Sequence, residues 1–313
     1  MENPLYPSSR SSHLSQTKVQ PMSIKALRST AVLSVAASAA IALAACSLEP
    51  RSSETASSGH PEWTTGMAVI GDYGTANDSE QAVSSQVKWW ADQNDADALV
   101  TTGDNAYPYS NPETLEAAWT PAYGWADELE VIATLGNHDV EDDGGVSTID
   151  YFDLPGPWYQ KTIGDVDVFV LDANQPEDPD QTQWLSETLE RSDAAWKVAV
   201  FHQPAFSCSL HDGDPLVVEQ WVPLLQRFGV DLVLSGHDHN YQRFAVGSTI
   251  YLVTGGGGSE LYDLAGCPEG IPTRLAANDE QHHFLAIQAS DEEMRVQAID
   301  TEGTILGSFS LRP

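Results

Sequence analysis

The chain has 313 residues and carries 46 acidic against 14 basic side chains, a formal net charge of −32 at pH 7. From Cys46 onward the imbalance is sharper, with 45 acidic residues against 10 basic ones. Because no basic surface is available to release counterions from a polyanion, the composition excludes nucleic acid and an acidic membrane surface as partners.

The N-terminal 45 residues predict an export signal. Two basic residues precede an alanine-rich apolar run, residues 31–45, which ends at Cys46. This order is typical of a signal peptide. Leu43-Ala-Ala-Cys46 resembles a bacterial lipobox, in which Cys46 would be lipidated and become the new N-terminus. The alternatives are a plain signal peptide and an uncleaved membrane anchor, although the run is short for a span of about 20 residues. Met22 is a candidate for the true start.

Behind the signal, residues 46–62 are polar and almost without large apolar side chains, which predicts a flexible tether. Residues 63–313 have the usual size of one large α/β domain. The predicted protein is therefore exported, either as a cell-surface lipoprotein or in secreted form. Its only membrane contact would be the lipid anchor, and the sequence leaves its oligomeric state open.

The domain alternates strands and helices as far as residue 234. Apolar runs predict strands at residues 67–70, 96–102, 131–135, 166–171, 198–201 and 230–234. Capping residues and apolar spacing predict helices at residues 78–90, from Asn111-Pro112 onward, and at 181–191 and 215–228. Later runs predict hairpin-linked strands at residues 250–253, 284–287, 294–298 and 304–309. The order predicts an α/β fold with mixed sheets and helices outside them.

Two further features receive structural interpretations. Trp89, Trp90, Trp184 and Trp196 lie at helix or strand positions and are predicted core residues. The tetraglycine Gly255–Gly258 is predicted to be a mobile turn, and the alternative is a close approach of the backbone to a metal site.

Polar residues with metal-binding side chains follow five of the predicted strands. In open α/β sheets, functional residues gather outside the carboxyl ends of the strands. The residues are Asp72, Asp104, Asn137, His138, His202, His237 and His239. Carboxylate and amide oxygens mixed with imidazoles suit a first-row transition metal better than Ca²⁺ or Mg²⁺. Each position alone is commonly a simple turn, but together they are numerous enough for two metals that share one carboxylate.

These residues lie in five ordered motifs that resemble those of the purple acid phosphatases, which include the tartrate-resistant acid phosphatases and belong to the calcineurin-like metallophosphoesterases. The motifs are Gly71-Asp-Tyr-Gly74, Gly103-Asp-Asn-Ala-Tyr107, Gly136-Asn-His138, Ala199-Val-Phe-His202 and Gly236-His-Asp-His239. One departure is Ala199, which stands where the fourth motif normally opens with valine. The resemblance implies a four-layer α/β/β/α sandwich with mixed β-sheets.

The resemblance also implies a binuclear metal centre and assigns its residues. Fe(III) would be held by Asp72, Asp104, Tyr107 and His239. A divalent metal, which could be iron, zinc or manganese, would be held by Asp104 as the bridge together with Asn137, His202 and His237. His138 and His211 would bind the phosphate and protonate the departing alcohol.

Tyr107 distinguishes this family from its wider superfamily. Most metallophosphoesterases carry Asp-x-His in the first motif, and Gly74 stands in the place of that histidine. Tyr107 is then the natural replacement as a ligand. The resemblance further implies a visible absorption band from tyrosinate-to-iron charge transfer.

The implied activity is hydrolysis of a small phosphate monoester by a metal-bound hydroxide, in mildly acidic solution. One alternative is a phosphodiesterase or a phospholipid-active enzyme on the same metal site. Another is a surface-binding lipoprotein that has lost activity, against which the complete ligand set argues. Cys208 and Cys267 either form a disulfide that would hold the loop of His211, or are two free thiols.

Overall fold

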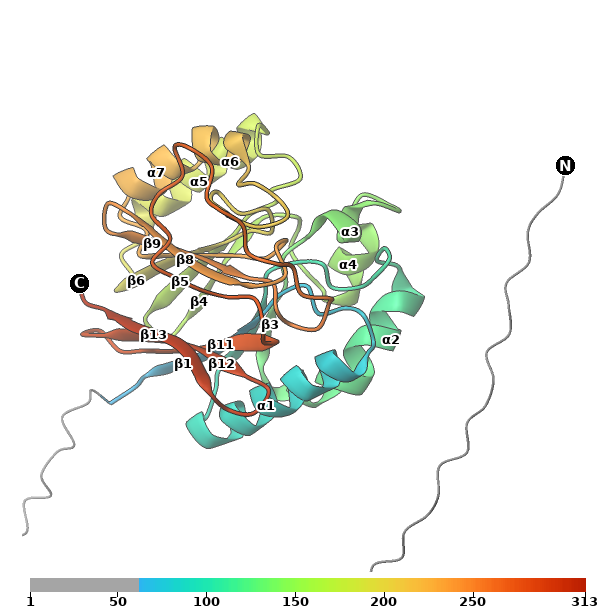
Figure 1. Cartoon of the computed structure of the whole chain (residues 1–313). Coiled ribbons are helices and arrows are strands. Elements are labelled where there is room, and N and C mark those ends of the chain that lie inside the picture. The colour runs from blue at the N-terminus through green and yellow to red at the C-terminus, as the bar shows by residue number, and fades with distance from the viewer. Residues whose placement is uncertain (1–61) are drawn as a thin grey trace, which may run out of the picture. The chain divides into compact units, whose positions relative to one another are not determined.

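The computed structural model describes residues 62–313 (Figure 1). The predicted export signal, the predicted lipidation site Cys46 and nearly all of the predicted tether lie outside the described residues. Within residues 62–313, no helix combines the length and the apolar character that crossing a membrane would require.

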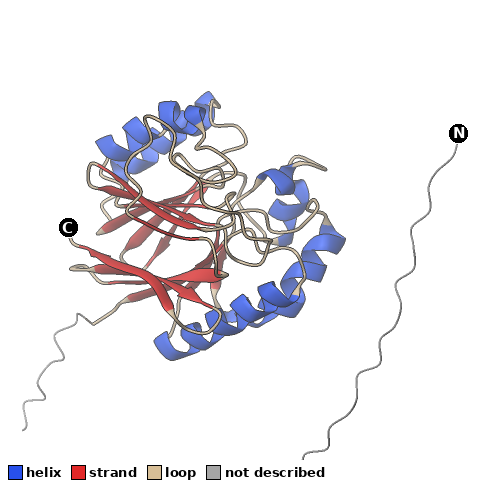
Figure 2. Ribbon diagram, in the orientation of Figure 1, coloured by secondary structure: helices blue, strands red, loops and turns tan. Residues whose placement is uncertain are grey.

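Two β-sheets form the middle of the domain (Figure 2). The first sheet contains β1 (Thr65–Ile70), β2 (Ala98–Thr101), β3 (Glu130–Ile132), β11 (His283–Ala289), β12 (Met294–Asp300) and β13 (Ile305–Leu311), in the order β13-β12-β11-β1-β2-β3. The second contains β4 (Tyr159–Ile163), β5 (Val166–Val170), β6 (Trp196–Val200), β7 (Leu232–Ser235), β8 (Tyr241–Val246), β9 (Thr249–Thr254) and β10 (Ala276–Asn278), in the order β10-β8-β9-β7-β6-β5-β4. Each sheet combines parallel and antiparallel pairs, as predicted.

Helices cover the outer face of each sheet (Figure 2). The first sheet is covered by α1 (Asp78–Asn94) and α2 (Pro112–Tyr123), and the second by α5 (Pro179–Arg191), α6 (Pro215–Gln220) and α7 (Val222–Arg227). The shorter elements η1 (Gly124–Glu128), α3 (Asn137–Val140) and α4 (Val146–Tyr151) follow α2 and β3. One apolar cluster fills the space between the sheets, and one lies under each helical layer. The predicted α/β/β/α sandwich is therefore confirmed.

Parallel pairing brings the ends of the predicted strands to a common edge. In the first sheet β1 pairs with β2 and β2 with β3, all parallel. In the second sheet the parallel series is β5, β6, β7 and β9. Since the carboxyl ends of parallel strands meet at one edge, the polar residues that follow β1, β2, β6 and β7 come together between the two sheets.

Local capping explains where the first two long helices begin. The side chain of Asn77 accepts a hydrogen bond from the backbone of Glu80 at the start of α1. The side chain of Asn111 accepts hydrogen bonds from the backbone amides of Glu113 and Thr114. The Thr114 hydroxyl oxygen in turn accepts a hydrogen bond from the Asn111 amide. Both are polar N-caps that satisfy amides left free in the first turn, and the start predicted at Asn111 is confirmed.

Two predictions about the elements were wrong, and three strands were missed. The helix predicted over residues 215–228 is two helices, because Pro223 has no amide hydrogen and its ring excludes the carbonyl four residues earlier. Trp89 is not a core residue, since 60% of its surface is exposed. It lies on the side of α1 away from Val83, Val87 and Trp90, which form the buried face. The short strands β4, β8 and β10 were not predicted.

Candidate metal centre

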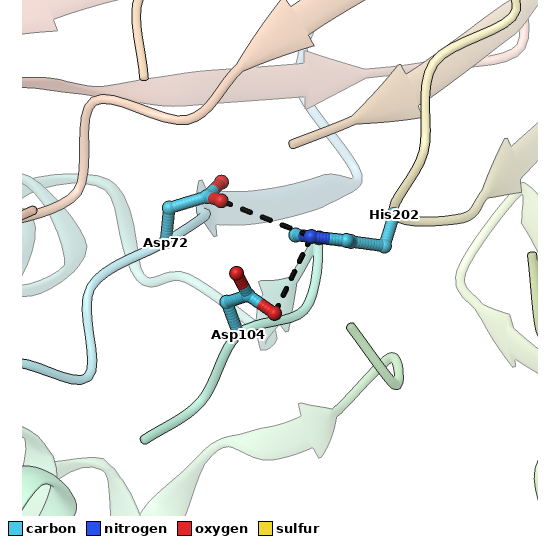
Figure 3. A group of neighbouring side chains, drawn as sticks. All are labelled: Asp72, Asp104 and His202. Carbon is cyan, nitrogen blue, oxygen red and sulfur yellow. Dashed lines mark ion pairs between the residues drawn. The ribbon is translucent and has the colours of Figure 1, made fainter. Parts of the chain in front are cut away.

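Carboxylates from the first sheet meet a histidine from the second (Figure 3). Asp72 follows β1, Asp104 follows β2, and His202 follows β6. Each offers one ligand atom, and these atoms lie within 4.8 Å of one another. His202 Nε2 is 3.3 Å from Asp104 Oδ1 and 3.9 Å from Asp72 Oδ1. All three side chains are buried. Burying an unpaired charge costs free energy, so these ionisable side chains need a partner of opposite charge.

The residues assigned to Fe(III) lie together. The Tyr107 hydroxyl donates to Asp104 Oδ2 at 2.9 Å and lies 3.3 Å from His239 Nε2. His239 Nε2 is in turn 3.4 Å from Asp72 Oδ1. Tyr107 and His239 are 132 residues apart in the chain, and the packing of the two sheets brings them into contact.

The residues assigned to the divalent metal lie on the other side of Asp104. His202 Nε2 is 3.1 Å from Asn137 Oδ1, and the His237 ring centroid is 5.1 Å from that of His202. Asp104 therefore faces both groups, with Oδ2 toward Tyr107 and Oδ1 toward His202. This is the placement that a shared carboxylate requires.

Backbone carbonyls orient the imidazoles. Nδ1 of His202 lies 2.8 Å from Thr102 O, and Nδ1 of His239 lies 2.7 Å from Glu260 O. Because a carbonyl oxygen only accepts hydrogen bonds, each Nδ1 carries a hydrogen and each Nε2 points toward the carboxylates. Histidine ligands in metal sites are commonly fixed by such a bond from the other ring nitrogen. The donor set and its orientation thus fit a pair of transition-metal ions.

The charges of these groups are strongly coupled. Burial opposes ionisation of Asp104, but His202 and His138 outweigh it and hold the pKa of Asp104 below its usual range. Burial likewise lowers the pKa of His202, but Asp104 and Asp72 outweigh it and raise that pKa to about 10. Burial, followed by the charges of Asp72 and Asp104, raises the pKa of Tyr107. The phenol is therefore neutral on its own, and a bound cation is needed to make it a tyrosinate.

Three of the site residues have strained backbones. Asp72, Asp104 and His237 have φ angles of 55°, 54° and 71°, in the left-handed region that side chains other than glycine rarely adopt. Such residues cost about 1–3 kcal/mol each and cluster at functional sites. Hydrogen bonds between these residues stabilise the strained conformations, since the His237 amide donates to both carboxylate oxygens of Asp72 at 3.0 and 3.1 Å.

Gly74 and Tyr107 are linked through the backbone. The Tyr107 amide donates to Gly74 O at 2.8 Å. A Cβ atom at Gly74 would lie 2.2 Å from Asn105 O and 2.4 Å from the Cα of Ala106. A histidine at this position therefore has no room unless the loop that carries Tyr107 moves. The exchange of a histidine in the first motif for a tyrosine in the second has a direct steric explanation.

His138 and His211 each pack on a different predicted ligand. The His138 ring packs on Tyr107 with centroids 4.6 Å apart, its Nδ1 is 2.6 Å from Pro108 O, and its Nε2 is 4.0 Å from Asp104 Oδ2. The His211 ring packs on His237 at 4.2 Å. The structure thus brings all nine sequence-predicted residues of the centre together, one histidine beside each group of ligands.

Two buried aspartates that the sequence analysis did not single out position the loops of the site. Asp139 accepts hydrogen bonds from the Gly136 amide and from Asn105, and so ties the second motif to the third. Burial, and then the charge of Asp104, raises the pKa of Asp139 to about 6. Asp238 accepts from the His211 amide at 3.0 Å. The available signal was their position, since each lies next to a predicted histidine in a motif.

The tetraglycine segment is not a mobile turn, which corrects the sequence prediction. A Cβ atom at Gly255 would lie 2.4 Å from Asp238 O and 2.7 Å from Asp72 Oδ2. The Gly257 amide donates to Gly71 O at 2.9 Å. The segment is buried, and its glycines allow the backbone to pack directly against the loop of Asp72.

The two cysteines of the domain are bonded to each other. Cys208 and Cys267 form a disulfide with their Cα atoms 4.6 Å apart. Cys208 lies three residues before His211, so the disulfide joins the loop of this histidine to the segment that follows β9.

Comparisons with known proteins agree with this geometry. The model of the calcineurin-like phosphoesterase family matches residues 67–241. Purple acid phosphatase 3 of Arabidopsis thaliana is 26% identical over 280 residues, which cover 78% of this chain and 76% of that protein. Tartrate-resistant acid phosphatase type 5 of Homo sapiens is 25% identical over 254 residues, which cover 67% of this chain and 78% of that protein.

Two solved structures have the same fold. Purple acid phosphatase PPD1 from yellow lupin superposes with a TM-score of 0.69 at 17% identity, over 79% of this chain and 53% of that chain. GAP50, described as the anchor in the inner membrane complex of Plasmodium, superposes with a TM-score of 0.69 at 16% identity, over 80% of this chain and 89% of that chain. Because the family model spans more than half of the sequence and the sequence relatives are purple acid phosphatases, the chain belongs to the calcineurin-like phosphoesterase family, as a purple acid phosphatase-like hydrolase.

Proposed function

We propose that this protein hydrolyses phosphate monoesters at a binuclear metal centre. The observation that carries the proposal is the position of Asp104, whose two oxygens face two separate ligand groups at 2.9 Å and 3.3 Å. One group adds a phenol, a carboxylate and an imidazole, and the other adds an amide and two imidazoles. Hard oxygens mixed with imidazoles favour transition metals over Ca²⁺ or Mg²⁺.

The two groups suit different ions. Asp72, Asp104, Tyr107 and His239 would hold Fe(III), and Asp104, Asn137, His202 and His237 would hold a divalent iron, zinc or manganese ion. Two carboxylates and a phenol that a bound cation would ionise gather around the first position, which favours the ion of higher charge. When bound, the two ions supply Lewis acidity and a hydroxide nucleophile at mildly acidic pH.

The protein's own side chains would orient the ester and handle the proton. His138 has its Nδ1 held by Pro108 O, which leaves Nε2 on the side of the ligand group. The ring of His211 packs on that of His237, with centroids 4.2 Å apart. A phosphate bound at the ligand group would be contacted by both imidazoles. One of the two would protonate the departing alcohol oxygen, which is the role of a general acid.

The test uses the full chain, purified with its metals. p-Nitrophenyl phosphate and bis-p-nitrophenyl phosphate would be assayed from pH 4 to 9, and metals would be counted by mass spectrometry. We expect two metal ions per chain, including iron, and faster hydrolysis of the monoester in acid. Faster hydrolysis of the diester would favour the phosphodiesterase alternative. A protein that binds two metals and hydrolyses neither ester would favour a binding lipoprotein.

We also propose that the chain is exported and lipidated at Cys46, because of the apolar run and the lipobox-like sequence before it. Mass spectrometry of the mature N-terminus tests this directly. A diacylglyceryl modification on Cys46 is expected. An unmodified N-terminus near residue 46 would instead indicate a secreted protein.

A further inference from the structure

A cavity of about 470 Å³ opens next to the His211 side of the candidate metal centre. Its walls are residues 209–210, which precede His211, and residues 260–265, which follow the tetraglycine segment. Neither wall belongs to the five motifs. Cavities of about 300–1,000 Å³ are the usual size for small-molecule sites.

One aromatic side chain is shared by the cavity and the metal centre. The ring of Tyr262 stacks on that of His239, with centroids 4.0 Å apart and planes 17° apart. The same ring is 5.9 Å from that of His211. Tyr262 therefore lines the cavity and also contacts His239 and His211, so the cavity borders the His211 side of the centre.

Covalent and hydrogen bonds hold the two walls together. The Cys208–Cys267 disulfide joins the segments. The Ala265 amide donates to Cys208 O at 2.9 Å, and the Ser209 hydroxyl donates to Asp263 O at 3.0 Å. The guanidinium of Arg274 donates to the carbonyls of Cys208 and Ala265, at 3.0 and 3.2 Å. The walls are thus cross-linked before any ligand arrives, which lowers the entropy lost on binding.

The cavity presents apolar surface with an acidic rim. Leu210 has 65% of its surface exposed, and Leu261, Tyr262 and Leu264 are partly exposed. Glu260 and Asp263 are exposed at the same place. No lysine or arginine is among the described residues that line the cavity. An apolar or aromatic group would gain by covering the leucines, whereas an anionic group would meet the acidic rim, since the nearby Arg274 is already bonded to the carbonyls of Cys208 and Ala265.

We propose that the departing alcohol of the substrate lies in this cavity, and that the enzyme prefers monoesters of aromatic or bulky apolar alcohols that are uncharged or cationic. This inference rests on the proposed function and adds a substrate class to it. Contacts remote from the phosphorus would hold the ester oxygen beside His211, so binding energy is used for orientation.

The first experiment measures binding and needs no turnover. The metal-loaded full chain is titrated calorimetrically with propylphosphonate and with 3-phenylpropylphosphonate, which share a head group and differ only in the ring. We expect the phenyl compound to bind about tenfold more tightly, in line with the discrimination that hydrophobic pockets achieve. Leu210→Ser should reduce this ratio to about threefold.

The matched control is Tyr109→Ser, which removes an exposed ring next to Pro108, whose carbonyl contacts His138, and should leave the ratio unchanged. Equal affinities for the two phosphonates, or no binding of either, would overturn the proposal. A ratio that changes in Tyr109→Ser and not in Leu210→Ser would also overturn it, because the alcohol would then lie near Tyr109 and not in the cavity.

The acidic rim is tested with 3-(4-carboxyphenyl)propylphosphonate. At low ionic strength it should bind about threefold more weakly than the uncharged ring, with the difference lost at high salt. Glu260→Gln combined with Asp263→Asn should also remove the difference. Equal or tighter binding of the carboxylate by the unaltered protein would refute the charge selection.

Failure of this inference can be told apart from failure of the proposed function. If p-nitrophenyl phosphate is hydrolysed while the phosphonates bind equally, the function stands and the cavity is not the alcohol site. If the tenfold ratio is observed without hydrolysis of any ester, the cavity binds as proposed and the monoesterase activity is wrong.

Discussion

The two sheets contribute different chemistry to the same site. The first sheet carries the predicted oxygen ligands in the segments after β1, β2 and β3, namely Asp72, Asp104, Tyr107 and Asn137. The second sheet carries the predicted nitrogen ligands in the segments after β6 and β7, namely His202, His237 and His239. We call these the oxygen side and the nitrogen side. The negative charge lies on one side and the neutralising imidazoles on the other, so neither sheet alone offers a complete site. A metal pair is expected to depend on the closed sandwich.

The strongest test of this comparison is Asp104→Asn. Asp104 is the one residue of the oxygen side whose two oxygens face both ligand groups. The amide has one oxygen and no charge, so we expect loss of both metals and a fall in kcat/KM of about 10³-fold or more, roughly 4 kcal/mol. Metal analysis and steady-state kinetics provide the measurement. The exposed Asp142→Asn should keep both metals, and retention of two metals in Asp104→Asn would contradict the bridging role.

A smaller effect is expected from the nitrogen side. His237→Asn removes a ligand assigned to the divalent metal alone, so the metal content should fall from two to one, with iron retained. Activity should fall about 10²-fold, because one ion can no longer help to stabilise the transition state. The visible absorption band should survive, and a spectrum of the purified variant tests this. Loss of iron together with the divalent metal would show that the two metal positions do not bind their ions independently.

Tyr107→Phe removes a single predicted ligand from the oxygen side. The substitution deletes one hydroxyl from a partly buried ring and leaves the packing on His138 in place. We expect the charge-transfer band to vanish and kcat/KM to fall by about 30-fold, as one anionic ligand is lost. Tyr109→Phe, two residues away and exposed, is the matched control. A Tyr107→Phe protein that keeps its colour would remove the tyrosine from the iron position.

The smallest expected effect concerns stability. Glu80 is buried in the first turn of α1, where its Oε2 accepts a hydrogen bond from the Ala76 amide in the loop after Asp72. Burial raises the pKa of Glu80 to about 8. When the pKa of a carboxyl is higher in the folded than in the unfolded state, the free energy of unfolding falls as the pH rises between the two pKa values. The free energy of unfolding of Glu80→Gln should therefore match that of the unaltered protein near pH 4.5 and exceed it increasingly as the pH rises to 8 and above.

Chemical denaturation at pH 4.5 and pH 8.5 tests this prediction. The control is Glu219→Gln, at an exposed position of α6, the helix that covers the second sheet. This substitution should leave the free energy of unfolding unchanged at either pH. Equal stability of Glu80→Gln and the unaltered protein at pH 8.5 would mean that Glu80 ionises without cost. The hydrogen bond from the Ala76 amide to Glu80 would then stabilise the loop after Asp72 whether or not Glu80 is protonated.

Much of the fold was predictable because its central strands are buried on both faces. Continuous apolar runs such as residues 67–70 and 198–201 mark them plainly, and Asn111 marks a helix start through its side-chain chemistry. β10 is a three-residue strand at the edge of its sheet, and its partners, not its own residues, hold it there. The exposure of Trp89 depended on the rotation of α1 about its axis, which apolar composition alone does not fix.

The sequence by itself determined which donors are available and at which strand ends they stand, because parallel strands deliver their following residues to one edge. The resemblance of the motifs implied how the donors group, but only the tertiary structure decided which of them are in contact. The contact of Tyr107 with His239, the division of the Asp104 oxygens and the carbonyls that orient His202 all cross between segments far apart in the chain. The cavity at Tyr262 likewise exists only because a disulfide and hydrogen bonds join two loops. Such contacts depend on how two sheets pack, which no local pattern encodes.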